Sequence, residues 1–348
     1  MSDKYVAYVG TYTQGTSHGI HVYDIEKGVL KEKQVQEINN PSNITISKDG
    51  KFLYSICDEG VAAFHILPDG QLSYINTAWI GGMRGCYVKV DDTNTLLFVG
   101  GFHDGKVTAM WINKDGSIGE IADSVYHKGL GNSFSERGSA PHVVCTQITP
   151  DSQYLCVADS GLSQIKIYSI NYETGKLSLA DILRFKLESG PRRIRFSKDG
   201  KFAYVLLQED NMMVTFKYVG PEHDEMFEKI DEFSTVLEKY GRCNSCEFKM
   251  SEDDKHIFVA IDGYNAVAIY ERNAKTGLLT FVCCSQVSGD YPKVVSPLPD
   301  GKHFVSLNHD SNQIMTFSVN YKDKYVLMSG APIKIDQPNC ILMNKMEG

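Results

Sequence analysis

Residues 194–207 read IRFSKDGKFAYVLL, and residues 43–56 repeat the phrase as NITISKDGKFLYSI. In both copies apolar and polar side chains alternate on each side of an Asp-Gly pair. This pattern is typical of two antiparallel strands joined by a tight turn, because glycine readily adopts a positive φ. Weaker copies begin at residues 87, 145, 246 and 294. The chain therefore contains a repeated hairpin.

Two more strands follow each hairpin, as in SQIKIYSI (163–170) and ETGKLSLADIL (173–183). Four antiparallel strands repeated at roughly 50-residue intervals are typical of β-propeller blades. PNCILM (338–343) resembles a first strand, and the N-terminal VAYVGTYT, GIHVYDI and LKEKQVQEI resemble strands two to four. We therefore predict an all-β, seven-bladed β-propeller, a single domain over residues 1–348, with one blade shared by the two ends.

Composition narrows the classes of partner. The net charge is −8 and no dense run of Lys or Arg occurs, so we expect no nucleic acid partner. The N-terminus lacks the pattern of a signal peptide, and no window has the roughly 18 apolar residues of a membrane span. We expect a cytoplasmic protein with no membrane partner, and the sequence does not define its oligomeric state.

The cysteines and glycines do not indicate a cofactor. The nine cysteines are an odd number, and several lie in strand-like runs, so we predict reduced, buried thiols. Cys243 and Cys246 have metal-like spacing, but a structural zinc site needs four ligands and no second pair follows. With no P-loop or dinucleotide motif, we assign no metal and no cofactor. A divalent ion held by channel acids and histidines stays an open alternative.

Two segments interrupt the repeat. KGLGNSFSERGSAPH (128–142) precedes a first strand, and we expect a loop at the mouth of the central channel that acts as a lid. The charged segment 220–240 suits a longer fourth strand with a surface loop or a short helix.

Several phrases together resemble one known family: YVGTYT, NPSNITISKDGKFLY, GCYVKVDD, PHVVCTQITPDSQYLCVAD and GPRRIRFSKDGKFAYV. They are similar to the lactonase family of seven-bladed propellers, which includes propeller-type 6-phosphogluconolactonases and carboxy-muconate cyclases. The resemblance spans essentially the whole chain. It implies a hydrolase of carbohydrate metabolism, or a lyase-type relative, that acts on a small molecule in the channel.

The resemblance also marks departures from the family pattern. Where the family has a histidine at the end of a PHxH phrase, this chain has Val144. A following GPRH phrase is kept as far as Arg192, and Arg193 replaces its histidine.

The remaining two family groups are replaced as well. Gln208 stands where the family has a glutamate, and Asp262 stands where it has an arginine. Glu209 is an alternative to Gln208, although alternation along a strand would place it on the opposite face unless a bulge intervenes.

Superposing the repeats predicts which side chains reach the channel, because the innermost strand of each blade lines it. Cations and His142 lie just ahead of first strands, and acids, amides and histidines lie at the ends of second strands. The first set is Arg84, His142, Arg192, Arg193 and Lys293, and the second is Asp58, His103, Asp159, Gln208, Asp262 and His309. Such a mouth suits a small anionic substrate, since arginine binds carboxylate or phosphate with two parallel hydrogen bonds.

For lactone hydrolysis we assign catalytic roles to three residues. His142 is the candidate base, because imidazole is largely neutral at pH 7 and alternation places it on the same side of its strand as Val144. Arg192 holds the substrate anion or the oxyanion, unless it pairs with Glu188 or Asp159. Gln208 donates an orienting hydrogen bond.

The other candidates are substrate contacts: His103, Asp159, Arg193, Asp262, Lys293 and His309. His103 is the alternative base, and its competing interpretation is a turn histidine bonded to Asp104. Two functions follow: a lactonase-like hydrolase for a sugar-acid lactone, or a propeller without catalysis that binds a small anionic metabolite or a protein partner.

Overall fold

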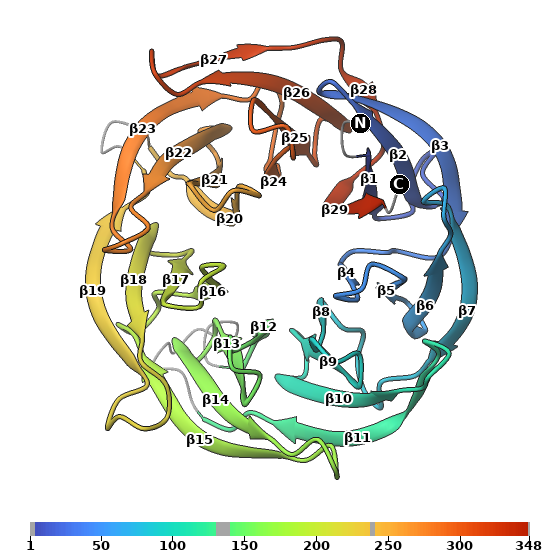
Figure 1. The fold of residues 1–348 in the computed structure, drawn as a ribbon, viewed down its shortest axis with the longest axis vertical. Coiled ribbons are helices and arrows are strands. Elements are labelled where there is room, and N and C mark those ends of the chain that lie inside the picture. The colour runs from blue at the N-terminus through green and yellow to red at the C-terminus, as the bar shows by residue number, and fades with distance from the viewer. Residues whose placement is uncertain (1–3, 130–139, 237–240, 347–348) are drawn as a thin grey trace. The chain divides into compact units, whose positions relative to one another are not determined.

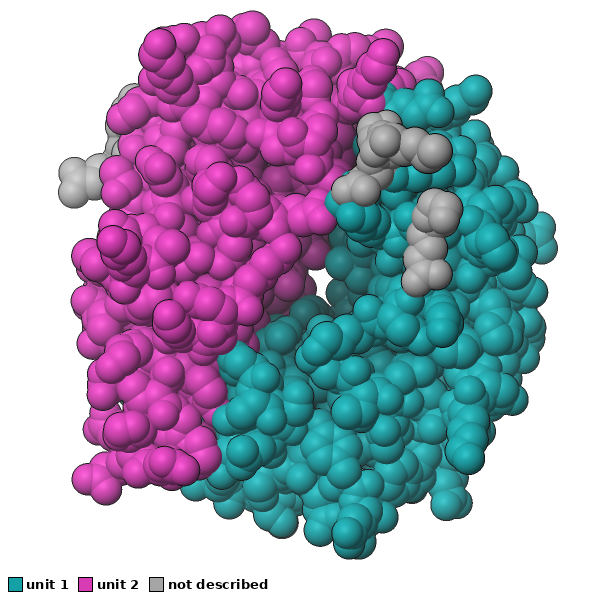
Figure 2. All heavy atoms as spheres, in the orientation of Figure 1, with its two compact units in different colours: residues 1–26, 30–190, 339–348 teal, residues 27–29, 191–338 magenta. Residues whose placement is uncertain are grey.

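The computed structural model describes residues 4–129, 140–236 and 241–346, which form seven antiparallel sheets (Figure 1). Two compact units, coloured separately in Figure 2, comprise residues 1–26, 30–190 and 339–348, and residues 27–29 and 191–338. We call them unit 1 and unit 2.

Unit 1 contains four sheets of four strands. In hydrogen-bonding order the first is β29 (Pro338–Met346), β1 (Lys4–Thr11), β2 (Gly19–Glu26) and β3 (Val29–Glu37). The second is β4 (Ile44–Ile46), β5 (Phe52–Cys57), β6 (Gly60–Ile66) and β7 (Leu72–Ala78). The third is β8 (Tyr87–Val90), β9 (Leu96–Gly101), β10 (Lys106–Ile112) and β11 (Ile118–Tyr126). The fourth is β12 (Val143–Ile148), β13 (Tyr154–Asp159), β14 (Gln164–Ile170) and β15 (Leu177–Arg184).

Unit 2 contains three sheets of the same design. They are β16 (Pro191–Phe196), β17 (Phe202–Leu207), β18 (Met212–Tyr218) and β19 (Phe227–Ser234); β20 (Asn244–Met250), β21 (His256–Asp262), β22 (Ala266–Arg272) and β23 (Leu279–Gln286); and β24 (Pro292–Pro297), β25 (His303–Asn308), β26 (Gln313–Asn320) and β27 (Tyr325–Met328). In the last sheet β26 also pairs with β28 (Ile333–Lys334), so the final strand is split in two.

The repeated SKDG segment folds as a turn that is closed by hydrogen bonds of its own serine and aspartate side chains. Ser197 Oγ donates to Asp199 Oδ1 at 2.6 Å, and the backbone N–H of Phe202 donates back to Ser197 Oγ at 3.1 Å. Gly200 adopts the predicted left-handed conformation, with φ 71°. Ser47 and Asp49 repeat the first contact at 2.6 Å. Short polar side chains thus close the hairpin before any tertiary contact is needed.

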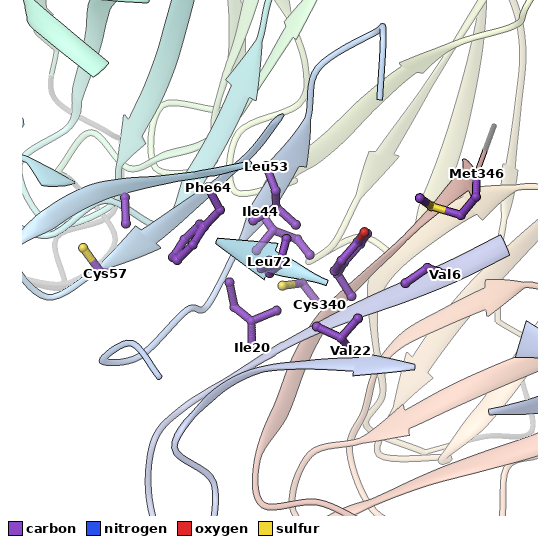
Figure 3. Close-up of a cluster of buried hydrophobic side chains, with 12 residues drawn as sticks. Val6, Ile20, Val22, Ile44, Leu53, Cys57, Phe64, Leu72, Cys340 and Met346 are labelled. Atoms are coloured by element: carbon purple, nitrogen blue, oxygen red, sulfur yellow. The ribbon is translucent and has the colours of Figure 1, made fainter. Parts of the chain in front are cut away.

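The two ends of the chain complete one sheet, as predicted, because β29 pairs with β1. Their packing explains the pairing: Cys340 and Met346 of β29 lie in one buried cluster with Val6 of β1 and Ile44 of β4 (Figure 3). The cluster joins the first two sheets of unit 1 through apolar contact, the main favourable contribution to folding.

The remaining segment predictions have mixed outcomes. Segment 220–240 contains a turn and the fourth strand β19, so the strand-and-loop alternative is correct, and residues 237–240 lie outside the described residues. All nine cysteines are free, and six of them are buried as predicted, whereas Cys86, Cys243 and Cys284 are half-buried. The described part of the chain has no helix long and apolar enough to cross a membrane.

Candidate functional site

In unit 1 the imidazole of His142, just before β12, is held through one nitrogen. Its Nδ1–H donates to the carbonyl oxygen of Phe102 at 2.7 Å. The two rings stack with centroids 4.2 Å apart and planes 9° from parallel. A carbonyl oxygen only accepts hydrogen bonds, so Nδ1 carries the proton and the neutral ring has its lone pair on Nε2. The ring plane and the tautomer of the predicted base are therefore both defined.

Asp159, the last residue of β13, is buried, with 0% of its surface exposed. Its Oδ1 accepts the backbone N–H of His142 at 2.9 Å and that of Leu162 at 3.0 Å. Its Oδ2 accepts the Nδ1–H of His127 at 2.6 Å. Both oxygens are occupied by the protein itself, in contrast to the substrate contact that the sequence predicts.

His127 completes this buried group. Burial lowers the pKa of His127 below its ordinary 6.5, despite the opposing effect of the Asp159 carboxylate. Its Nε2 has no hydrogen-bond partner among the described residues. Since Nδ1–H donates to Asp159, the unmatched atom is an acceptor lone pair and the ring is neutral at pH 7.

The other unit 1 candidates have different surroundings. His103 is exposed and meets the Phe102 ring edge-on at 5.4 Å, and no hydrogen bond to Asp104 forms in the described residues. Arg84 Nε lies 3.0 Å from Asp58 Oδ1, so these two side chains pair with each other.

A β-bulge recurs at the start of the first strand in four sheets. One extra residue opposes the neighbouring strand at each bulge: Val144 in β12, Arg192 in β16, Cys246 in β20 and Lys293 in β24. Side chains do not alternate regularly through a bulge. The regular alternation from which we expected His142 and Val144 to share one side is therefore interrupted at Val144. Val144 is 3% exposed, whereas His142, ahead of the strand, is half-buried.

The bulge in β16 gives two adjacent arginines opposite surroundings. Arg192 is half-buried, its Nε donates to the Cys246 carbonyl oxygen at 3.3 Å, and it makes no ion pair within the described residues. Arg193 is buried, and its Nε donates to Glu247 Oε2 at 2.6 Å. Arg193 is thus held inside unit 2 by Glu247, whereas the Arg192 guanidinium has no ion pair with the described residues.

Glu247 is the buried partner that accounts for Arg193. Arg195 approaches its other oxygen, with Nη2 3.1 Å from Oε1. Burial alone would raise the pKa of Glu247, but the two guanidinium groups lower it from 4.5 to about 2. The three side chains form an internal ion cluster between β16 and β20.

Three bulge residues of unit 2 are electrostatically coupled. Burial raises the pKa of the Cys246 thiol to about 12, Arg192 and Lys293 act in the opposite direction, and Asp262 adds to the increase. The Lys293 ammonium lies 5.6 Å from the centre of the Tyr291 ring. Arg192 and Lys293 therefore bring positive charge to a common region around a neutral thiol.

His309 borders the same region, with its ring edge-on to Tyr291 at 5.5 Å. Its Nδ1–H donates to the Pro338 carbonyl oxygen at 3.3 Å, and burial, followed by Lys293, lowers its pKa below 6.5. It is a neutral, buried neighbour of the cations.

Gln208 follows β17 with a half-buried side chain, and its amide makes no hydrogen bond within the described residues. Glu209 is exposed in the turn, so it does not take the position of Gln208. Asp262, at the end of β21, is half-buried, and its Oδ1 accepts the N–H of Gly263 at 2.7 Å.

A family model described as Lactonase, 7-bladed beta-propeller matches residues 6–343. The chain belongs to this family. The match confirms the predicted resemblance and the fold class, a seven-bladed β-propeller with four antiparallel strands per blade.

Lactonase-family relatives match over nearly their full length. The 6-phosphogluconolactonase of Bacillus subtilis (strain 168) is 29% identical over 347 residues, covering 97% of this chain and 98% of the relative. The crystal structure of a candidate 6-phosphogluconolactonase from Bacteroides fragilis superposes with a TM-score of 0.89 at 28% identity, covering 99% of each chain. The periplasmic gluconolactonase of Pseudomonas aeruginosa shares the fold, with a TM-score of 0.90 at 22% identity, covering 99% of this chain and 100% of that one.

Four residues of this lactonase-family chain that contact the predicted site residues were not predicted from the sequence: Phe102, His127, Glu247 and Tyr291. The acid in the strand NSCEFKM was a detectable signal for Glu247, because an acid within an apolar strand usually has a buried partner. Phe102 contributes a backbone carbonyl, which no residue pattern reveals. Residues 130–139 of the predicted lid lie outside the described residues.

Among residues 4–129, 140–236 and 241–346, no three His, Cys, Asp or Glu side chains are grouped so that they could hold a metal ion. Cys243 and Cys246 therefore have no further ligands among these side chains.

Proposed function

We propose that this protein hydrolyses a small anionic sugar-acid lactone, with 6-phosphogluconolactone as the first substrate to test. Full-length similarity to the 6-phosphogluconolactonase of Bacillus subtilis supports the reaction class and the substrate. The observation on which the mechanism depends is the hydrogen bond from His142 Nδ1–H to the Phe102 carbonyl oxygen, which makes Nε2 the basic nitrogen of the neutral ring.

In the proposed mechanism, His142 Nε2 removes a proton from water as the water oxygen attacks the lactone carbonyl carbon. The tetrahedral intermediate then breaks its ring C–O bond. The imidazolium returns the proton to the leaving oxygen, so that a hydroxy acid forms and the base is regenerated. A general base of this kind typically contributes about 10²–10⁴ in rate.

Arg192 is proposed to bind the anionic group of the substrate or the developing oxyanion, since its guanidinium has no ion pair within the described residues. Gln208 is proposed to donate an orienting hydrogen bond. The remaining proposed contacts are Lys293, Asp262, His309 and His103. Asp159 and Arg193 are left out, because their polar atoms bind internal partners.

The experiment measures hydrolysis of a lactone panel, including 6-phosphogluconolactone, against the spontaneous rate. We expect His142→Ala to lower kcat by about 10²–10⁴ and Arg192→Ala to raise KM about tenfold or more. His223→Ala and Arg184→Ala, which alter exposed residues, are the matched controls. Equal rates for His142→Ala and wild type would move the base elsewhere, with His103 as the next candidate.

The second candidate function is binding of a small anionic metabolite without catalysis. Val144, which is buried at the bulge position equivalent to Arg192, favours it, because a valine supplies no acid or base where the family resemblance implies a histidine. If no lactone is hydrolysed faster than in buffer, ligand-induced shifts in Tm with sugar-acid phosphates and carboxylates test this function.

A further inference from the structure

Asp159 places a buried carboxylate at a strand position where three other sheets have none. It lies at the last position of β13, opposite Val143 of β12. The same register position in three other sheets holds Leu207, Ile261 and Asn308. Apolar residues therefore satisfy the fold at this position in two of the sheets. Burying a carboxylate costs free energy unless it is paired and hydrogen-bonded, so its presence in this sheet needs a local explanation.

The local reason is the set of N–H groups that converge on it. Asp159 Oδ1 receives two backbone N–H groups, from His142 and Leu162, and Oδ2 receives the Nδ1–H of His127. A carboxylate accepts such bonds at both oxygens, and bonds to a charged acceptor are about twice as strong as neutral ones. Asp159 therefore fixes the backbone of the segment that enters β12.

Fixing this backbone also fixes the His142 ring. The carbonyl oxygen of His142 accepts the N–H of Ser160 at 2.9 Å, so both of its backbone polar groups are held by the segment 159–160. The side chain then meets Phe102 by stacking and through Nδ1. With backbone, ring plane and one nitrogen all constrained, the direction of the Nε2 lone pair is determined.

We infer that Asp159 is a positioning residue for catalysis, which holds His142 with its Nε2 directed as the base while His127 occupies the other carboxylate oxygen. This inference rests on the proposed role of His142. It replaces the substrate contact that the sequence predicts for Asp159 with an indirect role, because no oxygen of the carboxylate is left without an internal donor.

Two variants test the role. Asp159→Asn preserves size but presents a donor to His127 Nδ1, and Asp159→Leu uses the residue type found at the equivalent Leu207. Asp300→Asn is the matched control: Asp300 Oδ1 accepts the N–H groups of Lys302 and His303, and Oδ2 accepts His303 Nδ1–H at 2.6 Å. The control removes the same hydrogen-bond pattern from a turn that does not touch His142.

The first readout is kinetic, with 6-phosphogluconolactone or the lactone that the wild type hydrolyses best. We expect both Asp159 variants to lower kcat about 10- to 100-fold while KM changes less than about twofold, because a misdirected base affects the chemical step. Asp300→Asn should retain wild-type kcat. A folded Asp159 variant with kcat within twofold of wild type would overturn the inference.

The second readout does not depend on catalysis. In protein labelled with ¹⁵N-histidine, the His142 signals, assigned by their loss in His142→Gln, should report the Nδ1–H tautomer in wild type and in Asp300→Asn. In the Asp159 variants they should report a tautomer mixture. An unchanged tautomer in both Asp159 variants would also overturn the inference. If the wild type hydrolyses no lactone but the tautomer responds to Asp159, the proposed function fails and the positioning of His142 stands.

Discussion

The two units each bury a carboxylate, and each carboxylate is satisfied differently. Glu247 in unit 2 is paired with the guanidinium groups of Arg193 and Arg195. Asp159 in unit 1 is met by two backbone N–H groups and the neutral imidazole of His127. Cationic partners make Glu247 part of the packing between strands, whereas N–H partners make Asp159 a support for one segment of backbone. The two carboxylates thus differ in the chemical type of their partners, which are guanidinium groups at Glu247 and N–H groups without charge at Asp159.

The largest expected effect is the loss of Glu247. Glu247→Ala removes the carboxylate that pairs with the buried Arg193 guanidinium, and breaking a buried ion pair from one side typically costs about 3–5 kcal/mol in the free energy of unfolding. Urea unfolding measures the change. Glu232→Ala, which breaks the exposed pair with Lys229, is the control and should cost less than about 1 kcal/mol. Equal losses in the two variants would show that the internal ion cluster adds nothing to stability.

Lowering the pH should destabilise the two units in different pH ranges, through Glu247 in unit 2 and through His127 in unit 1. The folded-state pKa of Glu247 is about 2, below its ordinary 4.5, so the unfolded chain binds more protons between these values and stability falls as pH drops through this window. The loss amounts to about 3 kcal/mol. Glu247→Gln should remove this pH dependence, and an unchanged acid profile in that variant would contradict the assignment.

His127 should respond at higher pH. Its pKa is lowered from 6.5, so the unfolded chain again binds more protons, and stability declines as the pH falls below about 6.5. Asp159 and Lys166 are the charged groups that act on it. His127→Phe should lose this decline but keep the Glu247 phase, as measured by Tm across pH.

Removing Asp159 should cost less stability than removing Glu247. Asp159→Leu leaves the N–H groups of His142, Leu162 and His127 without an acceptor but leaves no arginine unpaired. A cost of about 1–3 kcal/mol in the free energy of unfolding is expected. Urea unfolding of this variant beside Glu247→Ala ranks the two directly. A loss above that of Glu247→Ala would reverse the comparison.

The smallest stability change is expected for Arg192→Ala. Its only protein hydrogen bond among the described residues goes to the Cys246 carbonyl, so the free energy of unfolding should change by about 1 kcal/mol or less. Arg193→Ala should cost several times more, because it removes a partner of buried Glu247. Similar Tm values for the two variants would show that the bulge does not separate their roles.

The sequence alone was enough to predict the blades but not the contacts of the candidate site. The reason is that the residues that interact in the site lie farther apart along the chain. The SKDG turn is closed by side chains two and five residues apart, so its signal is local. The Phe102 carbonyl that fixes His142 lies 40 residues away, and Glu247 lies 54 residues from Arg193. Only the folded chain defines such pairs.

Which of Arg192 and Arg193 is buried depends on a β-bulge, a second feature that the sequence pattern does not reveal. Regular alternation would assign adjacent residues to opposite faces, but it does not indicate which face is buried when an extra residue enters the strand. The bulge between Pro191 and Arg193 makes that assignment in β16. With the extra residue at Arg192, Arg193 is buried beside Glu247 and Arg192 is half-buried, and their predicted contacts with an anion stay predictions.

The pairing of β29 with β1 imposes an order on biosynthesis. The partners β1, β2 and β3 leave the ribosome first, but the strand that completes their sheet is the last described strand to be made. During translation β1 therefore presents an unpaired edge, which can bind other extended chains. A nascent chain arrested before residue 338 should keep this edge open, whereas synthesis of β29 provides the strand that closes it.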